Sequence, residues 1–447
     1  MASAAEQLAS SLNLGAFAKA TELKKRIWFT LGALVIYRLG TYIPLPGIDP
    51  QILSEIFKSQ SGGLLDIFDM FSGGALGRMT IFALTIMPYI SASIIIQLLT
   101  AVSPTLEALK KEGEVGRKKL NQYTRYGTVF LAAVQAYGIA TGLEVSGRGG
   151  SLGSPVIDPG LFFRLTTVVT LTGGTVFLMW LGEQITARGV GNGISLIIFT
   201  GIVARMPAAL VQLLELGRTG SLSPFVIVAF MVGAVAVITF IVFMERAQRR
   251  ILVQYPKRQV GNKMFGGEAS HLPLKLNSSG VIPPIFASSL LLLPSTIASL
   301  ASPDSVLADV AQYLRPGSLV HMVLYAALII FFCFFYTAIV FNPAETAENL
   351  RKYGGFVPGI RPGKNTADYL DYVLTRLTLV GAIYLTVVCL LPEYLISEFS
   401  LPFYFGGTSL LIVVSVTMDT VAQIHSHLLA HQYEGLIKKA KLRGRRG

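Results

Sequence analysis

Ionisable side chains inside apolar stretches are the first candidates for chemistry in this sequence. Asp419 lies within one apolar run and Glu183 near the end of another, where a carboxylate could bind the coupling ion of a transporter. Cys333 and Cys389 also lie in apolar runs, and they form no disulfide framework. No metal-ligand set accompanies the 5 histidines. Two scattered acids make a poor ion relay, so a secondary transporter for small solutes is the weaker alternative.

The sequence motifs of nucleotide, metal and redox enzymes are missing. There is no Walker A sequence, no H-E-x-x-H, no cysteine cluster and no Gly-rich dinucleotide turn. An intramembrane enzyme is disfavoured because no catalytic constellation is present. We therefore expect neither catalysis nor a cofactor.

Isoleucines form a more regular pattern. They recur every four residues in two apolar segments: Ile86, Ile90 and Ile94 in one, Ile194 and Ile198 in the other. Each set forms an apolar stripe on one face of a helix, and Ile285 and Ile412 could join them. Such residues usually face lipid or pack within a bundle. The functional alternative is a constriction that excludes water and ions by dewetting yet yields to a passing chain.

A glycine-rich break precedes one of these segments. In FDMFSGGALGR at Phe68–Arg78, Gly73 and Gly74 interrupt any helix. The piece before it is too short to span a bilayer and too apolar for an ordinary loop; it comprises Gly63, Leu64, Leu65, Asp66, Ile67, Phe68, Asp69, Met70 and Phe71. Non-helical backbone is tolerated at membrane depth only where it is buried in protein or lines a cavity. We predict a removable stopper, anchored only through the flexible Gly73–Gly74 hinge; the alternative is a hairpin on the outer surface.

The elements that must position these residues are membrane helices. The chain is 52% hydrophobic and 14% charged, with a mean hydropathy of +0.59. The apolar runs are Ile27–Tyr42, Met79–Val102, Tyr123–Thr141, Leu161–Leu181, Gly193–Ala204, Pro224–Met244, Val281–Leu300, Val320–Phe341, Leu377–Leu391 and Phe403–Leu428. They are continuously apolar, whereas the strands of a membrane β-barrel alternate apolar and polar residues. Each run must therefore satisfy the hydrogen bonds of its own backbone by forming a helix. We predict an all-α integral membrane protein with about ten transmembrane helices.

Two of these segments share one design. Ile86–Leu99 reads IMPYISASIIIQLL and Ile282–Leu292 reads IPPIFASSLLL, with proline, serine and aliphatic positions in the same order. A paired, proline-interrupted segment in each half indicates internal duplication, with the working site where the halves meet.

Charge sets the orientation of the chain. Most of the 37 Lys and Arg residues lie in the N-terminal segment, the even-numbered loops and the tail. The positive-inside rule therefore places both termini in the cytoplasm. The net charge of +12 is mostly a topology signal, although a basic face would also attract acidic lipid headgroups or an anionic partner.

Several longer motifs point to a known family. They are FDMFSGGAL at Phe68–Leu76, MPYISASIIIQLL at Met87–Leu99, QYTRYG at Gln122–Gly127, GNGIS at Gly191–Ser195, HLPLKLN at His271–Asn277, NPAETAENLRKYGGFVPGIRPG at Asn342–Gly363 and FGGTSLLIVV at Phe405–Val414. With these motifs, the sequence from Leu23 to Lys441 resembles the SecY family, the central subunits of bacterial protein-conducting Sec channels.

The resemblance implies a clamshell of two pseudo-symmetric halves with five helices each, at 24–218 and 219–430, flanked by a cytoplasmic segment at 1–23 and a basic tail at 431–447. It implies a plug at about 62–71 and a lateral gate between the second and third helices on one side and the seventh and eighth on the other. It also implies a pore ring of Ile86, Ile90, Ile194, Ile198, Ile285 and Ile412. Gln97, Gln135 and Asn277 lie in or beside gate helices, where their hydrogen bonds could hold the closed state or serve only as packing.

The family also implies partners. Arginine binds phosphate and carboxylate bidentately. The basic residues expected to contact the ribosome and the motor ATPase SecA are Arg249, Arg250, Lys257 and Arg258 in the loop at about 245–276, and Arg361 in the loop at about 343–376. The small subunits SecE and SecG, signal peptides, unfolded precursor chains and membrane lipids complete the expected set. The expected function is a gated conduit for secretory proteins, with a lateral port for membrane helices, in the cell inner membrane.

Overall fold

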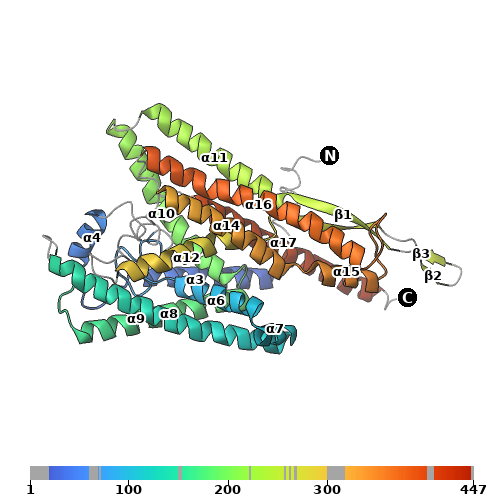
Figure 1. Cartoon of the computed structure of the whole chain (residues 1–447), viewed down its shortest axis with the longest axis horizontal. Helices are drawn as coiled ribbons and strands as arrows, with labels where there is room; N and C mark the ends of the chain where they lie inside the picture. Colours follow the sequence, from blue (N-terminus) through green and yellow to red (C-terminus); the bar gives the residue numbers. More distant parts are fainter. Residues whose placement is uncertain are drawn as a thin grey trace. The chain divides into compact units, whose positions relative to one another are not determined.

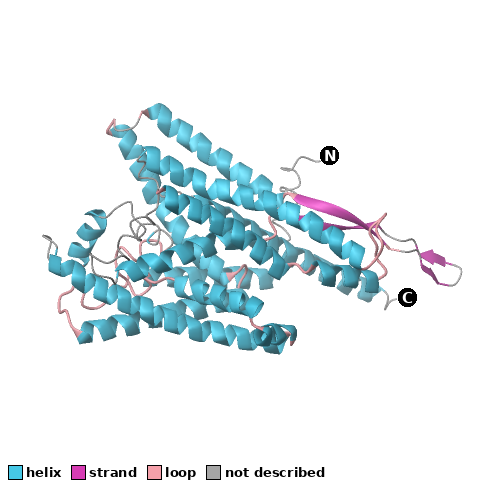
Figure 2. Ribbon diagram, in the orientation of Figure 1, coloured by secondary structure: helices cyan, strands magenta, loops and turns pink. Residues whose placement is uncertain are grey.

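The computed structural model describes residues 20–59, 69, 72–149, 154–220, 223–255, 258–260, 263–265, 269–299, 318–399 and 407–443. Its helices are α3 (Thr21–Gly40), α4 (Pro50–Ser59), α6 (Met87–Val102), α7 (Pro104–Lys111), α8 (Glu114–Gly149), α9 (Leu161–Arg188), α10 (Gly193–Arg218), α11 (Pro224–Arg246), α12 (Ile282–Ser299), α14 (Leu319–Val340), α15 (Pro343–Lys352), α16 (Lys364–Phe399) and α17 (Gly407–Arg443). Figures 1 and 2 show how strongly helices dominate the chain.

Each predicted apolar run overlaps one of these helices, so the predicted helical membrane architecture is confirmed. Within the described residues, seven helices are long and apolar enough to cross a bilayer, or eight if a bent pair counts as one span. That pair is α6 and α7, which meet at an angle of 99°.

One predicted helix begins later than expected. The apolar run starts at Met79, but α6 starts only at Met87. Met79 and Thr85 have positive φ values of 44° and 53°, which a right-handed helix does not allow. The stretch pairs instead with the chain after α3, because Leu45 N–H donates to the Met79 carbonyl at 2.9 Å and Ile81 N–H donates to the Ile43 carbonyl at 3.1 Å.

The chain forms two compact units. The first comprises Met1–Ile96, Leu109–Leu210 and Ile412–Gly447, and the second comprises Gln97–Ala108 and Val211–Leu411. The predicted division into halves at 24–218 and 219–430 stays a prediction.

In the first unit, α8 and α9 form a long antiparallel hairpin, which Figure 1 shows in teal and green. Ala132, Ala136 and Ala140 recur every four residues along α8 and are fully buried. Small residues let the backbones of membrane helices approach closely. The alanines belong to the same core as Phe163 and Leu171 of α9, so the small stripe sets the hairpin packing.

In the second unit, α14 packs against both α12 and α16, and α15 packs against α16. Strands β1 (Gln248–Gln254) and β4 (Ala269–Lys275) form an antiparallel pair, and β2 (Arg258–Val260) and β3 (Lys263–Phe265) form a second. The apolar pattern of the sequence did not predict these strands. Ile251 and Val253 are buried while the other residues of β1 are exposed, an alternation too short to stand out beside the long apolar runs.

Candidate functional site

The predicted pore ring consists of isoleucines on several helices. Ile90 lies on α6, Ile194 and Ile198 on α10, Ile285 on α12 and Ile412 on α17; Ile86 directly precedes α6. Ile86, Ile90, Ile198 and Ile412 are each less than one-tenth exposed, while Ile194 and Ile285 are half-buried. Ile285 belongs to the second unit and the others to the first. The ring itself stays a prediction.

Local caps fix where the ring helices begin. The Ile86 carbonyl accepts from Ile90 N–H at 3.1 Å, so Ile86 occupies the cap position of α6. On α10, the Asn192 side chain accepts from Ile194 N–H at 3.1 Å and caps the helix within the GNGIS motif. Gly191 has a φ of 88°, and its N–H donates to Gln423 of α17 at 2.9 Å. These bonds fix the start of α10 directly before its ring isoleucines.

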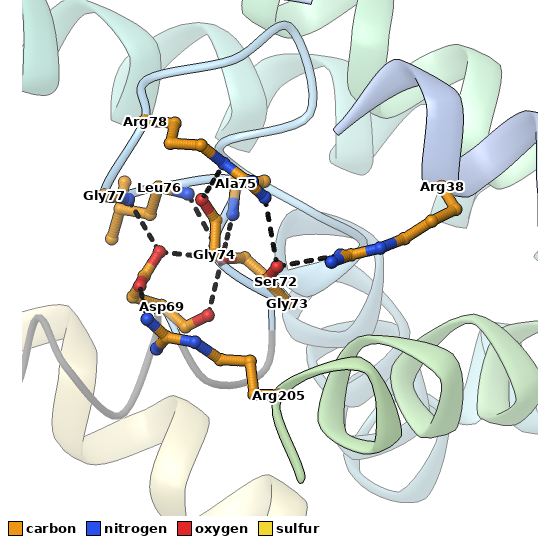
Figure 3. A network of polar contacts seen from close by, with 10 residues as sticks. All are labelled: Arg38, Asp69, Ser72, Gly73, Gly74, Ala75, Leu76, Gly77, Arg78 and Arg205. Atoms are coloured by element: carbon orange, nitrogen blue, oxygen red, sulfur yellow. Dashed lines mark hydrogen bonds and ion pairs between the residues drawn. The ribbon is translucent and has the colours of Figure 1, made fainter. Parts of the chain in front are cut away.

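A polar turn at residues 72–78 follows the predicted plug, of which the structure describes Asp69 alone (Figure 3). The other predicted plug residues, 63–68 and 70–71, lie outside the described residues. Asp69 is 3% exposed. Its Oδ1 accepts from Gly77 N–H at 2.6 Å and from Ser72 Oγ at 3.2 Å, and its Oδ2 forms an ion pair with Arg205 of α10 at 2.8 Å. The carboxylate therefore links the turn to α10.

Two more arginines hold the same turn. Arg38 of α3 donates to the Gly73 carbonyl at 2.8 Å, and Arg78 donates to the same carbonyl at 3.3 Å. The Arg78 guanidinium lies 4.2 Å from the ring centroid of Tyr42, beyond the end of α3. The hydrogen bond from Arg78 and then the charge of Arg38 lower the pKa of Tyr42. This arrangement gathers positive charge around one backbone turn.

The prediction that only a flexible Gly73–Gly74 hinge anchors this region is wrong. Both glycines have positive φ values, 65° and 88°, as a tight turn requires. However, the turn is fixed from α3 by Arg38 and from α10 by Arg205. Side chains distant in sequence supply these restraints, so the glycines alone gave no sign of them.

Glu183 is held in an ion pair. Arg125 Nε and Nη2 donate to its two carboxylate oxygens at 2.9 and 2.7 Å. At the other end of the same hairpin, Arg164 of α9 donates two hydrogen bonds to Glu144 of α8, at 2.9 and 2.6 Å. In each helix the Arg and the Glu are about 19 residues apart, or about 28 Å, close to the thickness of a bilayer core. Both pairs therefore suit the two membrane edges of the hairpin.

The predicted gate residues have different surroundings. Asn277 is 4% exposed and donates to Glu245 at the end of α11 at 2.7 Å and to the Gly280 carbonyl at 3.1 Å. These bonds join α11 to the start of α12 within one unit. Gln97 on α6 and Gln135 on α8 are half-buried. A gating role for the three residues stays a prediction.

Three of the predicted docking residues, Arg249, Arg250 and Arg361, lie on one folded structure rather than on separate loops. The backbones of Gln254 and Phe356 pair in both directions at 2.9 Å, which joins β1 to the loop of Arg361. We call β1, β4, α15, residues 353–363 and the start of α16 the loop module. Its buried core contains Ile251, Leu274, Ala347, Val357, Leu370 and Val373.

Within the loop module, Arg249, Arg250 and Arg361 are exposed. The Arg361 carbonyl accepts from Thr366 Oγ1 at 2.9 Å, and this bond fixes the backbone of the loop. Lys257 and the side chain of Arg258 lie outside the described residues. The shared core of the two loops could not be predicted from the sequence, because no local pattern in either loop indicates the other.

Metal binding finds no support in the part of the chain that the structure describes, because no group of three or more His, Cys, Asp or Glu residues there could hold an ion. Arg38, Arg78 and Arg205 are site residues that the sequence patterns did not single out. An arginine inside an apolar run, as Arg38 is, or directly after one, as Arg205 is, is itself a signal, since its charge needs a partner at membrane depth.

Known proteins are similar to this chain in sequence and in fold. A model of the SecY family matches residues 80–421. The protein translocase subunit SecY of Rickettsia conorii is 57% identical over 423 residues, covering 94% of this chain and 97% of that relative.

Two solved structures share the fold. One is a SecY channel whose plug domain is described as stabilising the closed state and maintaining a membrane seal; it has a TM-score of 0.64 and 17% identity, covering 91% of this chain and 92% of that one. The other is Sec61 in the canine ribosome-channel complex from the endoplasmic reticulum, with a TM-score of 0.62, 17% identity and coverage of 91% and 92%. At these identities the two structures support the fold alone.

Proposed function

Because this chain belongs to the SecY family, we propose that it is the protein-conducting channel of a bacterial inner membrane. It passes unfolded secretory proteins across the membrane and releases hydrophobic segments sideways into lipid. Both termini face the cytoplasm, as the distribution of Lys and Arg favours.

The observation that carries this proposal is the chemistry of the six predicted ring positions. All are isoleucine, and they come from four helices and the residue that caps one of them. Aliphatic side chains exclude water and ions from a narrow passage. They offer no directional hydrogen bond to a moving peptide, so they close a pore without trapping its substrate.

A small-solute transporter would need a different site. Such proteins hold coupling ions on carboxylates or exposed carbonyl groups at the middle of the membrane. Here Glu183 is engaged by Arg125 and Glu144 by Arg164. Ion pairs of this kind stabilise a helix hairpin, whereas a coupling site must bind and release its ion.

We propose that the loop module is the docking surface for partners. The ribosome is one, supported by the fold shared with the ribosome-bound canine channel. SecA is the other, supplying the energy that this chain lacks the motifs to provide. SecE and SecG are the proposed membrane subunits, and signal peptides, precursor chains and lipids are the remaining contacts.

Reconstituted transport tests the proposal. Vesicles containing the purified chain with SecE are given SecA, ATP and a precursor with a signal sequence, and protease-protected precursor is measured. We expect ATP-dependent protection. Ile412→Asn is expected to admit precursors with defective signals, because a polar group wets the constriction. Absence of protease-protected precursor, in vesicles that contain folded channel and active SecA, would refute the function. If Ile412→Asn leaves the ion leak and the signal stringency unchanged, the ring is refuted.

A further inference from the structure

We propose that Arg205 is a positioning residue that couples the pore-ring helix α10 to the turn at residues 72–78. The inference rests on the proposed function and adds a regulatory link to it. An ion pair and a close backbone contact then join the ring helix to the region after the plug, so neither moves independently of the other.

The link begins with a buried carboxylate. The side chain of Asp69 is 5% exposed, and that of Arg205 is 34% exposed. The Oδ1 of Asp69 accepts from the turn, and its Oδ2 pairs with Arg205 at 2.8 Å. A buried carboxylate is costly without a cation, so separation of the two elements is strongly opposed.

A second contact joins the same elements one helical turn away. A Cβ placed on Gly73 would lie 3.0 Å from the Cα of Gly201 and 3.1 Å from its carbonyl oxygen. The backbone of the turn therefore lies directly on the backbone of α10 at Gly201. Close backbone packing at one point and an ion pair at Arg205 together fix the turn on the helix, as Figure 3 shows for Arg205.

Both contacts share a face of α10 with the predicted ring residues. Ile194, Ile198, Gly201 and Arg205 follow one another at intervals of four, three and four residues, the spacing of a single helix face. Arg205 lies about 10 Å along the helix axis from Ile198. One face of one rigid helix thus carries two ring isoleucines and both contacts to the turn.

This geometry makes release of the turn depend on movement of α10. A shift of α10 that widens the ring pulls Arg205 away from Asp69 or carries the turn with it. Conversely, loss of the pair removes an interaction that favours the closed arrangement, so the population shifts toward the open one. Such a channel leaks ions when no precursor is present, and it transports precursors that have defective signals.

The test compares Arg205→Gln, Asp69→Asn and the double variant in vesicles, with two readouts: ion leak without precursor and transport of a precursor with a defective signal. We expect each single change to raise both readouts about tenfold. The double variant should exceed Arg205→Gln by little, because both changes break the same pair. Asp69→Asn keeps an oxygen that accepts from Gly77 and Ser72 and removes only the negative charge. This variant therefore tests the ion pair with α10 without disturbing the hydrogen bonds within the turn.

Two more variants serve as controls. Arg205→Lys keeps a cation beside Asp69 and should return most of the seal. Arg218→Gln changes an exposed arginine in the last turn of the same helix and should leave both readouts at the wild-type level.

Each outcome separates the coupling from the channel function. If the wild-type chain transports precursor but Arg205→Gln and Asp69→Asn seal as tightly as it does, the coupling is refuted and the channel function stands. If the effects of the two single variants add in the double variant, the residues act separately and the coupling is also refuted. Failure of the wild-type chain to transport would overturn the proposed function before any variant is compared.

Discussion

Replacing Gly73 with alanine is expected to destabilise the first unit because this glycine meets two constraints at once. Its φ of 65° lies in the left-handed region, where a side chain is disfavoured. Because Gly73 has no Cβ, Gly201 can also pack closely against it. An added Cβ would lie only 3.0 Å from the Gly201 Cα. The same Cβ would lie 2.9 Å from Arg38 Nη1, which donates to the Gly73 carbonyl.

The two constraints can be given separate magnitudes. A left-handed residue with a Cβ costs about 1–2 kcal/mol. Overpacking against a backbone that cannot retreat adds about 1–3 kcal/mol. Gly73→Ala should therefore lower the free energy of unfolding by about 2–5 kcal/mol.

Gly113 provides the matched control. Its φ is 77°, and nothing lies within 4 Å of the position that a Cβ would take. Gly113→Ala should therefore carry only the backbone cost of about 1–2 kcal/mol. The measurement is unfolding of the purified chain in mixed micelles as sodium dodecyl sulfate is raised, followed by circular dichroism. Equal losses in the two variants would refute the close packing of the turn on α10.

Three other substitutions test the polar contacts and the loop module. Glu144→Gln should lower the unfolding temperature more than Glu183→Gln does, because the Glu144 side chain is 4% exposed and that of Glu183 is 31% exposed; the reverse order would contradict the burial argument. Asn277→Ala should likewise be more destabilising than Ser278→Ala, since Asn277 is buried and bridges two elements whereas Ser278 is half-buried and donates to Lys275 in its own turn; scanning calorimetry compares them. Arg361→Glu should block SecA-driven transport yet leave membrane insertion intact, and the block should persist at low ionic strength because the loop geometry is fixed; normal transport at matched expression would leave this arginine only a topological role.

The sequence alone determined the helical membrane architecture. Continuous apolar runs have one solution in a bilayer, because each backbone must satisfy its hydrogen bonds within its own segment. The runs at Pro224–Met244 and Val320–Phe341 accordingly match α11 and α14 to within a few residues. The family was also readable from local motifs such as GNGIS, whose Asn192 proves to be a helix cap.

Tertiary structure decided where α6 begins, how the loop module folds and which charged side chains pair. The start of α6 at Met87 depends on pairing with the chain after α3, and the loop module depends on a core shared between residues about 100 positions apart. The Asp69–Arg205 and Glu144–Arg164 pairs likewise join side chains from different elements. Periodicity reports which face of an element is apolar. The partner that a charged side chain meets is fixed only when the elements pack, because that contact depends on the distance between two backbones rather than on either sequence segment.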